Sequence, residues 1–348
     1  MSEEPKKRFS WRAIITAATF VALAILIYGL RDDIRGVVNN LGRVNTLALL
    51  LMIPIAAISN DADARFFRNI FATLGKKIAY WPMYRLNLEL NFVNHILPSG
   101  GISGISYFNV RMRSVGVNGA KSTLAQVVKL FLLYASFQPL LVLGVFLLAA
   151  RGHVDGLVLV VASSLITLLI VGTFVGIYII ESRSRINSFL TYATKALNAI
   201  VHFFRRGSRE TIGIKKAQKT FDELHDNYEH IKHNWRELKR PFFYMMVTNF
   251  AEVASIYVVY IAFGRLVNVG AVILAYAVAN FAGLISVLPA GIGVYEGLMT
   301  GVLVATGIPA DLSIPVTIMY RVLSMTIQLA PGYYFYQKAL HNGLSKVE

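Results

Sequence analysis

Two stretches of the sequence place a proline and several glycines in the middle of long apolar segments. The first is "LPSGGISG" at 97–104, and the second is "LPAGIGVYEG" at 288–297, in which Glu296 adds a carboxylate. Proline and glycine would allow each segment to enter a membrane, turn and leave as a hairpin. The chemistry that this arrangement suits is the binding of a polar or charged group at membrane depth. An ordinary loop between two short helices would explain either stretch alone, whereas the matched pair favours a functional site.

Polar side chains recur at helical spacing in the segment that leads into the first stretch. Within residues 80–97, one quadrant of a helix would carry Asn87, Asn91, Asn94 and His95. We interpret this stripe as the wall of a cavity, because a stripe that leads to a broken helix exceeds what one interhelical contact needs. The alternative is that the asparagines hydrogen-bond to neighbouring helices, as small polar side chains commonly do in membranes.

The second half of the sequence carries buried charges of both signs. One predicted helix has a polar face of Thr248, Glu252 and Ser255, and another has a polar face of Arg321, Ser324 and Gln328. Because a carboxylate and a guanidinium seldom stay unpaired in hydrocarbon, we expect Glu252 or Glu296 to pair with Arg321. The planar fork of the arginine suits a lipid phosphate. A purely structural ion pair is the alternative.

Other candidate residues point away from catalysis. Lys129 either faces the same cavity, together with Gln126, or extends its ammonium to the cytoplasmic surface, and we favour the second interpretation. The glycine-rich stretches at 116–123 and 291–297 lack the spacing of a P-loop or a dinucleotide fingerprint. The histidines near Glu229 are better explained as a solvated helix face than as a metal site. We therefore expect no catalytic residues, no cofactor and no metal.

The composition indicates a membrane protein. Of 348 residues, 55% are hydrophobic and only 15% are charged, whereas a water-soluble chain usually has about a quarter of its residues charged. The apolar runs recur at lengths near the roughly 20 residues that cross a hydrocarbon core. These observations predict an all-α, polytopic helical membrane protein and exclude a soluble enzyme.

The uneven distribution of Lys and Arg predicts the topology. The net charge is +15, and thirteen of the 34 Lys and Arg residues lie in 183–240. Others gather at 1–12, 65–85 and 111–121, so by the positive-inside rule these segments and both termini are expected in the cytoplasm. The basic charge then needs no nucleic acid partner. The expected location is the cytoplasmic (inner) membrane of a bacterial cell.

This topology divides the chain into two membrane halves. We predict a cytoplasmic tail at 1–10, a first half at 11–180, a cytoplasmic amphipathic loop at 181–240, a second half at 241–337 and a tail at 338–348. The six predicted spanning helices are 11–30, 44–60, 121–149, 157–180, 241–263 and 313–337. The remaining apolar segments, 78–110 and 270–308, would be re-entrant hairpins that enter from opposite sides, as in an inverted repeat.

The cytoplasmic loop carries apolar residues at heptad spacing over residues 214–238. Our first interpretation is an antiparallel helical hairpin that bridges the two membrane halves. The alternatives are a helix that lies on the inner leaflet, or a partner contact that forms a homodimer or binds an enzyme of envelope synthesis.

The sequence resembles the lysylphosphatidylglycerol synthase transmembrane-region family, the flippase-like membrane domain also found in the multiple peptide resistance factors. The resemblance covers nearly the whole chain. One family motif joins a proline, a Gly-rich turn, a glutamate, a later arginine and a Pro-Gly pair, here Pro289, Gly291, Gly293, Glu296, Arg321, Pro331 and Gly332. The other is an Asn-rich approach to a Pro-Gly turn and an arginine, here Asn91, Asn94, Pro98, Gly100, Gly101, Gly104 and Arg111.

The resemblance implies that the protein binds or moves a membrane lipid with a charged, phosphate-bearing or sugar headgroup. The motif residues and Glu252 are the candidate lipid-binding residues. Where many relatives carry a glutamate after the last glycine of the Asn-rich motif, this chain has Ile105, which argues against two symmetric carboxylates. No aminoacyl-transfer domain follows, so we do not expect a synthase. The alternatives are a secondary transporter of small solutes or ions, and a membrane scaffold that transports nothing.

Overall fold

The computed structural model describes residues 28–29, 31–42, 44–96, 102–150, 156–185, 187–188, 191–192, 226–285 and 293–342, and in this part of the chain every regular element is a helix. Five helical segments are long and apolar enough to cross a membrane: Thr46–Thr73, Gly119–Ala149, Ala162–Ile179, Trp235–Ala262 and Ala310–His341. The prediction of an all-α polytopic membrane protein is therefore confirmed. The first predicted span, 11–30, lies almost entirely outside the described residues.

The second predicted span is longer than we expected. α3 (Thr46–Leu49) is followed after a single turn by α4 (Met52–Thr73), whereas the sequence predicted an end at residue 60 and a basic loop from 65. The helix continues because its inner face stays apolar, with Phe66, Phe67 and Ile70 fully buried. The helix stops before Gly75, whose positive φ of 77° lets the N–H of Lys76 donate to the carbonyl of Phe71.

The centre of the bundle is an antiparallel pair, α4 and α11 (Lys239–Ala262). At one end the backbone N–H of Asn45 donates to the carbonyl of Ala262 (2.9 Å), and at the other end the hydroxyl of Thr73 donates to Glu237 (2.7 Å). We call the end at Thr73 the basic end, because the described parts of the loops that we expect in the cytoplasm lie there. The other is the Asn45 end.

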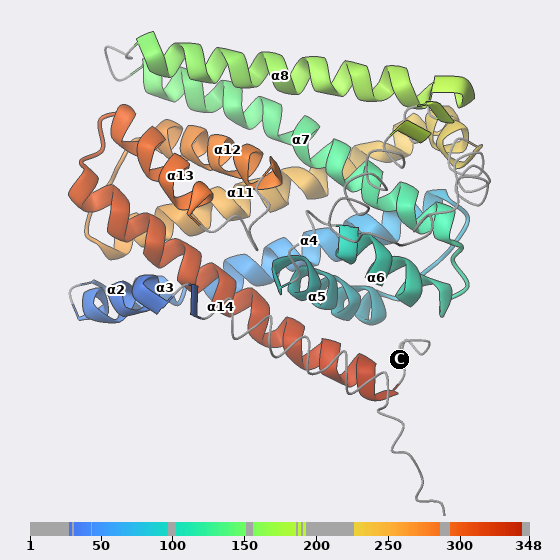
Figure 1. Ribbon diagram of the computed structural model, residues 1–348, viewed down its shortest axis with the longest axis horizontal. Coiled ribbons are helices and arrows are strands. Elements are labelled where there is room, and N and C mark those ends of the chain that lie inside the picture. Colours follow the sequence, from blue (N-terminus) through green and yellow to red (C-terminus); the bar gives the residue numbers. More distant parts are fainter. Residues whose placement is uncertain are drawn as a thin grey trace, which may run out of the picture.

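Two helix pairs flank the predicted hairpin turns and sit towards opposite ends of the bundle (Figure 1). α5 (Tyr80–Ile96) starts at the basic end and α6 (Ile102–Arg113) returns to it, while α12 (Val269–Ile285) starts at the Asn45 end and α13 (Val294–Ala305) returns there. The turns themselves, 97–101 and 286–292, lie outside the described residues. This course is the one expected for hairpins that enter from opposite sides, and their re-entrant path in a bilayer stays a prediction.

The long helix that follows the hairpin in each half packs against the hairpin of the other half. α7 (Gly119–Ala149) contacts α12, and α14 (Ala310–Asn342) contacts α5. Glycines allow both close approaches: a Cβ on Gly270 of α12 would lie 2.2 Å from the Gly144 carbonyl oxygen of α7, and a Cβ on Gly332 of α14 would lie 2.7 Å from the Leu88 carbonyl oxygen of α5. The two halves therefore brace one another.

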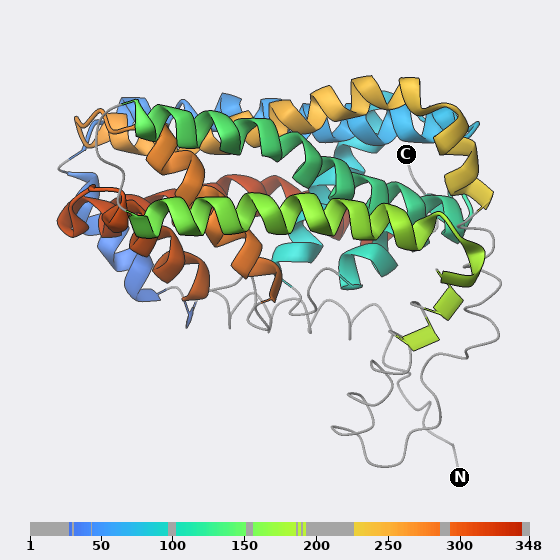
Figure 2. The ribbon, with the colours of Figure 1, turned by 90° about the horizontal axis from the view of Figure 1, so that it is seen from above.

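The outermost described helices follow the same pairing. α8 (Gly156–Ile180) lies beside α7 at the edge of the bundle, and α2 (Arg31–Leu41) lies beside α14 (Figures 1 and 2). The segment that we predicted as the outside loop 31–43 is thus mostly helical. α2 thus packs beside α14 as α8 packs beside α7, and the inverted repeat stays a prediction.

The last part of the loop that we predict to be cytoplasmic, 181–240, contacts the basic end. Its described residues form a helix at 226–233 and the 3₁₀ turn Trp235–Leu238, and the side chains of Tyr228, Ile231 and Leu238 pack on the apolar cluster of α4 to α7. Lys232 pairs with Glu181 after α8 (2.8 Å), and its hydrogen bond and charge lower the pKa of that carboxyl. In this part of the loop, the apolar residues at heptad spacing are therefore already packed against other helices of the same chain. The rest, 214–225, lies outside the described residues, and the predicted partner contact stays a prediction.

Candidate functional site

A polar cavity of about 220 Å³ lies inside the bundle, and seven helices contribute to its wall. Both halves of the chain supply charged or amide side chains to it, among them Asn60, Asp63, Asn91, His95, Lys129, Glu252, Asn280 and Arg321. Ionisable groups within membrane helices are rare and face a cavity or one another, because exposure to hydrocarbon is costly. The cavity is therefore the candidate functional site.

Arg321 pairs with Glu296 across α14 and α13. Its Nε lies 2.8 Å from Oε1 of Glu296, and its guanidinium lies 4.2 Å from the ring centre of Tyr295. Glu296 also accepts a hydrogen bond from the backbone N–H of Gly293 (2.6 Å), which has a φ of 84° and precedes the first turn of α13. The carboxylate thus fixes the start of α13 and the arginine together, next to the predicted turn at 286–292.

Glu252, the other carboxylate that we considered as a partner of Arg321, has a different contact. It lies on α11 and accepts a hydrogen bond from the hydroxyl of Tyr320 (2.9 Å). Both residues line the cavity. Of the two predicted pairings, the structure contains the ion pair with Glu296.

Lys129 pairs with Asp63 inside the cavity, so our interpretation that it extends to the surface was wrong. Its ammonium lies 2.7 Å from Oδ2 of Asp63 and 5.2 Å from the ring centre of Phe67. Asp63 also accepts a hydrogen bond from Thr248 of α11 (3.3 Å). The sequence analysis missed Asp63 because it ended the helix before this residue. Because α4 continues past residue 60, it places the carboxylate of Asp63 beside Lys129. The ammonium of Lys129 therefore has a partner inside the bundle and does not need to reach the surface.

The asparagine stripe of α5 divides between packing and the cavity. Oδ1 of Asn60 accepts hydrogen bonds from the amides of Asn87 (3.1 Å) and Asn91 (3.0 Å), which joins α4 to α5. Asn87 is fully buried, whereas Asn91 and His95 line the cavity. Both interpretations of the stripe therefore apply, each to different residues.

Three further residues of the predicted site, Asn94, Gly104 and Arg111, lie where α5 faces α6. Asn94 is exposed and is not part of the described cavity wall. Gly104 allows α6 to approach the Asn94 side chain of α5 closely, since a Cβ at Gly104 would lie 1.8 Å from Oδ1 of Asn94. Arg111 makes a bidentate ion pair with Glu89, at 2.9 and 3.1 Å, and both side chains are at most 5% exposed. The structure thus gives Arg111 a position that joins the arms of the first hairpin. The remaining predicted residues, Pro98, Gly100, Gly101, Pro289 and Gly291, lie outside the described residues.

A similarity between the two halves of the sequence identifies Asp63, the cavity residue that the sequence analysis missed. Ser59-Asn60-Asp61-Ala62-Asp63 on α4 recurs 189 residues later on α11 as Thr248-Asn249-Phe250-Ala251-Glu252. Lys129 precedes Pro139 of α7 by ten residues, and Arg321 precedes Pro331 of α14 by ten. Each half therefore brings a carboxylate and a cation to the cavity from corresponding helices, and the sequence contained this signal beside the two proline motifs.

Comparisons with known proteins agree with the sequence resemblance. The profile of a family described as the lysylphosphatidylglycerol synthase TM region matches residues 13–332. A UPF0104 membrane protein of Methanocaldococcus jannaschii is 24% identical over 317 residues, which cover 89% of each chain. A UPF0104 membrane protein of Pyrococcus horikoshii is 22% identical over 248 residues, 69% of this chain and 72% of the relative.

A third relative matches over a shorter region. The UPF0104 membrane protein of Methanothermobacter thermautotrophicus is 31% identical over 102 residues, 29% of this chain and 30% of the relative. All three relatives are archaeal, so the predicted bacterial origin stays a prediction. Their names describe membrane proteins and state no substrate.

Proposed function

Because the chain belongs to the lysylphosphatidylglycerol synthase transmembrane-region family, we propose that it binds a lipid by a charged or phosphate-bearing headgroup and moves it across the cytoplasmic membrane. The observation that carries this proposal is the pair of cations in one cavity. Lys129 comes from α7 and Arg321 from α14, so both halves of the chain present positive charge to the same space. The proposal is one of binding and transport, without catalysis.

Both cations are held ready for an anionic group. In the structure each has a carboxylate within 2.8 Å, which offsets the cost of burying the charge. A phosphate could replace the carboxylate beside Arg321, whose guanidinium can offer it two parallel hydrogen bonds, while Lys129 adds positive charge to the same cavity. Exchange of one anion for another would let a headgroup enter without leaving a cation unpaired.

The arrangement of the hairpins supports alternating access. Transporters built from inverted repeats place their substrate between broken helices and rock the two halves around it. Here α5 and α13, which flank the two predicted turns, both contribute side chains to the cavity wall. We propose that the basic end faces the cytoplasm, with both termini there, and that an ion gradient or the gradient of the lipid itself drives transport.

A scrambling assay tests the proposal. Purified protein in liposomes would be given headgroup-labelled anionic, aminoacylated and polyprenyl-phosphate lipids. We expect selective crossing of one lipid class by the wild type and its loss in Arg321→Ala and Glu296→Gln. Arg265→Ala, which removes an exposed arginine at the Asn45 end, is the control for the loss of one positive charge and should keep full activity.

The assay also separates the alternatives. A cavity of about 220 Å³ would hold a small charged solute, so uptake of a soluble substrate without any lipid crossing would favour a secondary transporter. No transport by a folded protein, together with unchanged function in cells after substitution of Pro98, Pro289 or Arg321, would favour a scaffold.

A further inference from the structure

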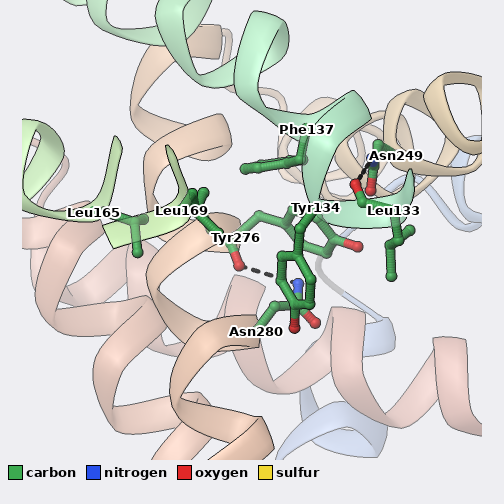
Figure 3. A pocket seen from close by; sticks show the side chains of 9 residues that line it. Leu133, Tyr134, Phe137, Leu165, Leu169, Asn249, Tyr276 and Asn280 are labelled. Atoms are coloured by element: carbon green, nitrogen blue, oxygen red, sulfur yellow. Dashed lines mark hydrogen bonds between the residues drawn. The ribbon is translucent and has the colours of Figure 1, made fainter. Parts of the chain in front are cut away.

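An apolar pocket adjoins the polar cavity on the side of α8 (Figure 3). It lies among α7, α8, α11 and α12, and its wall includes Phe137 of α7, Leu165 and Leu169 of α8, and Ala277 of α12. Its volume is about 50 Å³, against about 220 Å³ for the cavity. The pocket is therefore narrow and mostly apolar, so it suits a thin hydrocarbon group and excludes a hydrated headgroup.

The pocket and the cavity share part of their walls. Leu133 of α7 and Tyr276 and Asn280 of α12 line both spaces. Figure 3 shows Tyr276 and Asn280 together with the apolar side chains of the pocket, and the amide of Asn280 donates to the Tyr276 carbonyl (3.0 Å). A molecule with a polar group beside Arg321 would therefore have an apolar space next to that group.

A single helix separates the pocket from the outer surface of the bundle. Leu165 and Leu169 of α8 face inwards and are 8% and 6% exposed, while Leu168 and Phe174 on the same helix are 49% and 68% exposed. Only 17% of the apolar segment Ala162–Ile179 of α8 is buried inside the protein. The outer face of α8 is accordingly the surface expected to meet lipid tails, and the pocket lies directly behind it.

We infer that this pocket is the hydrocarbon-chain subsite of the lipid whose headgroup occupies the polar cavity. The inference rests on the proposed function and narrows the substrate class to lipids with a thin, flexible apolar chain next to the headgroup. Shared residues join the two spaces, the polar space holds both cations, and the apolar space lies one helix away from the bilayer. The headgroup and the start of one chain thus have adjoining sites of matching polarity.

Photo-crosslinking on the wild-type protein tests this placement. The probe is an anionic phospholipid with a diazirine in one acyl chain, added to the protein in liposomes, with crosslinks located residue by residue. We expect crosslinks at Leu165, Leu169 or Ala277, and much stronger competition by the unlabelled lipid than by its water-soluble headgroup without acyl chains. Crosslinks confined to outward residues such as Leu168 and Phe174, or equal competition by the free headgroup, would overturn the inference.

Matched tryptophan variants of α8 test the contribution to binding. Leu169→Trp fills the pocket and should weaken binding of the long-chain lipid about tenfold, the effect of excluding roughly two methylene groups from an apolar site. Leu168→Trp, one residue away on the exposed face, should bind as the wild type does. The affinity of Arg321→Ala for the same lipid, measured in the same experiment, gives the contribution of the headgroup.

The result distinguishes failure of the subsite from failure of the proposed function. If Arg321→Ala weakens binding while Leu169→Trp does not, the headgroup site stands and the chain subsite is wrong. If neither variant changes binding and the wild type does not discriminate among headgroups, the proposed function fails as well. If Leu169→Trp does not fold, the crosslinking experiment on the wild type decides alone.

Discussion

The two halves of the chain bring a cation to the same cavity, but they hold it in different ways. In the first half Lys129 pairs with Asp63 on α4, one of the two central helices. In the second half Arg321 pairs with Glu296 on α13, next to a predicted turn. The two pairs are similarly buried, with side-chain exposures between 8% and 18%. The difference therefore lies in the element that supplies the carboxylate.

This difference assigns different tasks to the two cations. Glu296 lies eight residues after Leu288, and the corresponding place after Leu97 in the first hairpin is held by Ile105, which has no charge. Only the second hairpin thus offers a carboxylate at this position. We interpret the Lys129 pair as a fixed link between α4 and α7, and the Arg321 pair as the one that opens when the second hairpin moves.

The largest effect is expected from Asp63→Asn, which leaves Lys129 without its carboxylate. Breaking a buried ion pair by removing one partner destabilises a protein by about 3–5 kcal/mol. Thermal unfolding of the purified protein should show this loss. The double variant Asp63→Asn/Lys129→Met should recover most of the stability, because no unpaired charge remains. A single variant as stable as the double one would contradict the role of this pair as a fixed link.

Substitutions at the two close helix contacts between the halves are expected to lower stability by an intermediate amount. Gly270→Ala and Gly332→Ala place a methyl group where α12 meets α7 and where α14 meets α5. Overpacking of this kind typically costs about 1–3 kcal/mol. We expect both variants to unfold at lower temperature, with Gly270→Ala worse because its Cβ would approach a backbone oxygen more closely. Gly36→Ala on α2, where a Cβ meets no atom within 4 Å, is the control.

The sequence predicted the fold class and part of the site for clear physical reasons. Arg321 and Glu252 are recognisable because a charge inside a long apolar run needs a polar environment. Asp63 was missed because Arg65 and Arg68 follow it closely, and clustered basic residues are typical of cytoplasmic loops. Arg111 was predicted only as a motif residue that binds lipid, and its ion pair with Glu89 depends on how α5 and α6 meet, which no local pattern encodes.

The smallest effect is expected when each cation is replaced by the other type, Arg321 by Lys and Lys129 by Arg. This exchange compares the two halves of the chain most directly. Arg321→Lys keeps the charge but removes the planar fork, so a phosphate beside it loses a charge-assisted hydrogen bond, and we expect transport to fall about tenfold. Lys129→Arg keeps a cation for Asp63 and should change transport less than about threefold, because this pair does not need to open. The scrambling assay measures both, with thermal unfolding as the check that each variant folds. Equal losses in the two variants would mean that both cations contact the headgroup, and the division of tasks between the two halves would then be wrong.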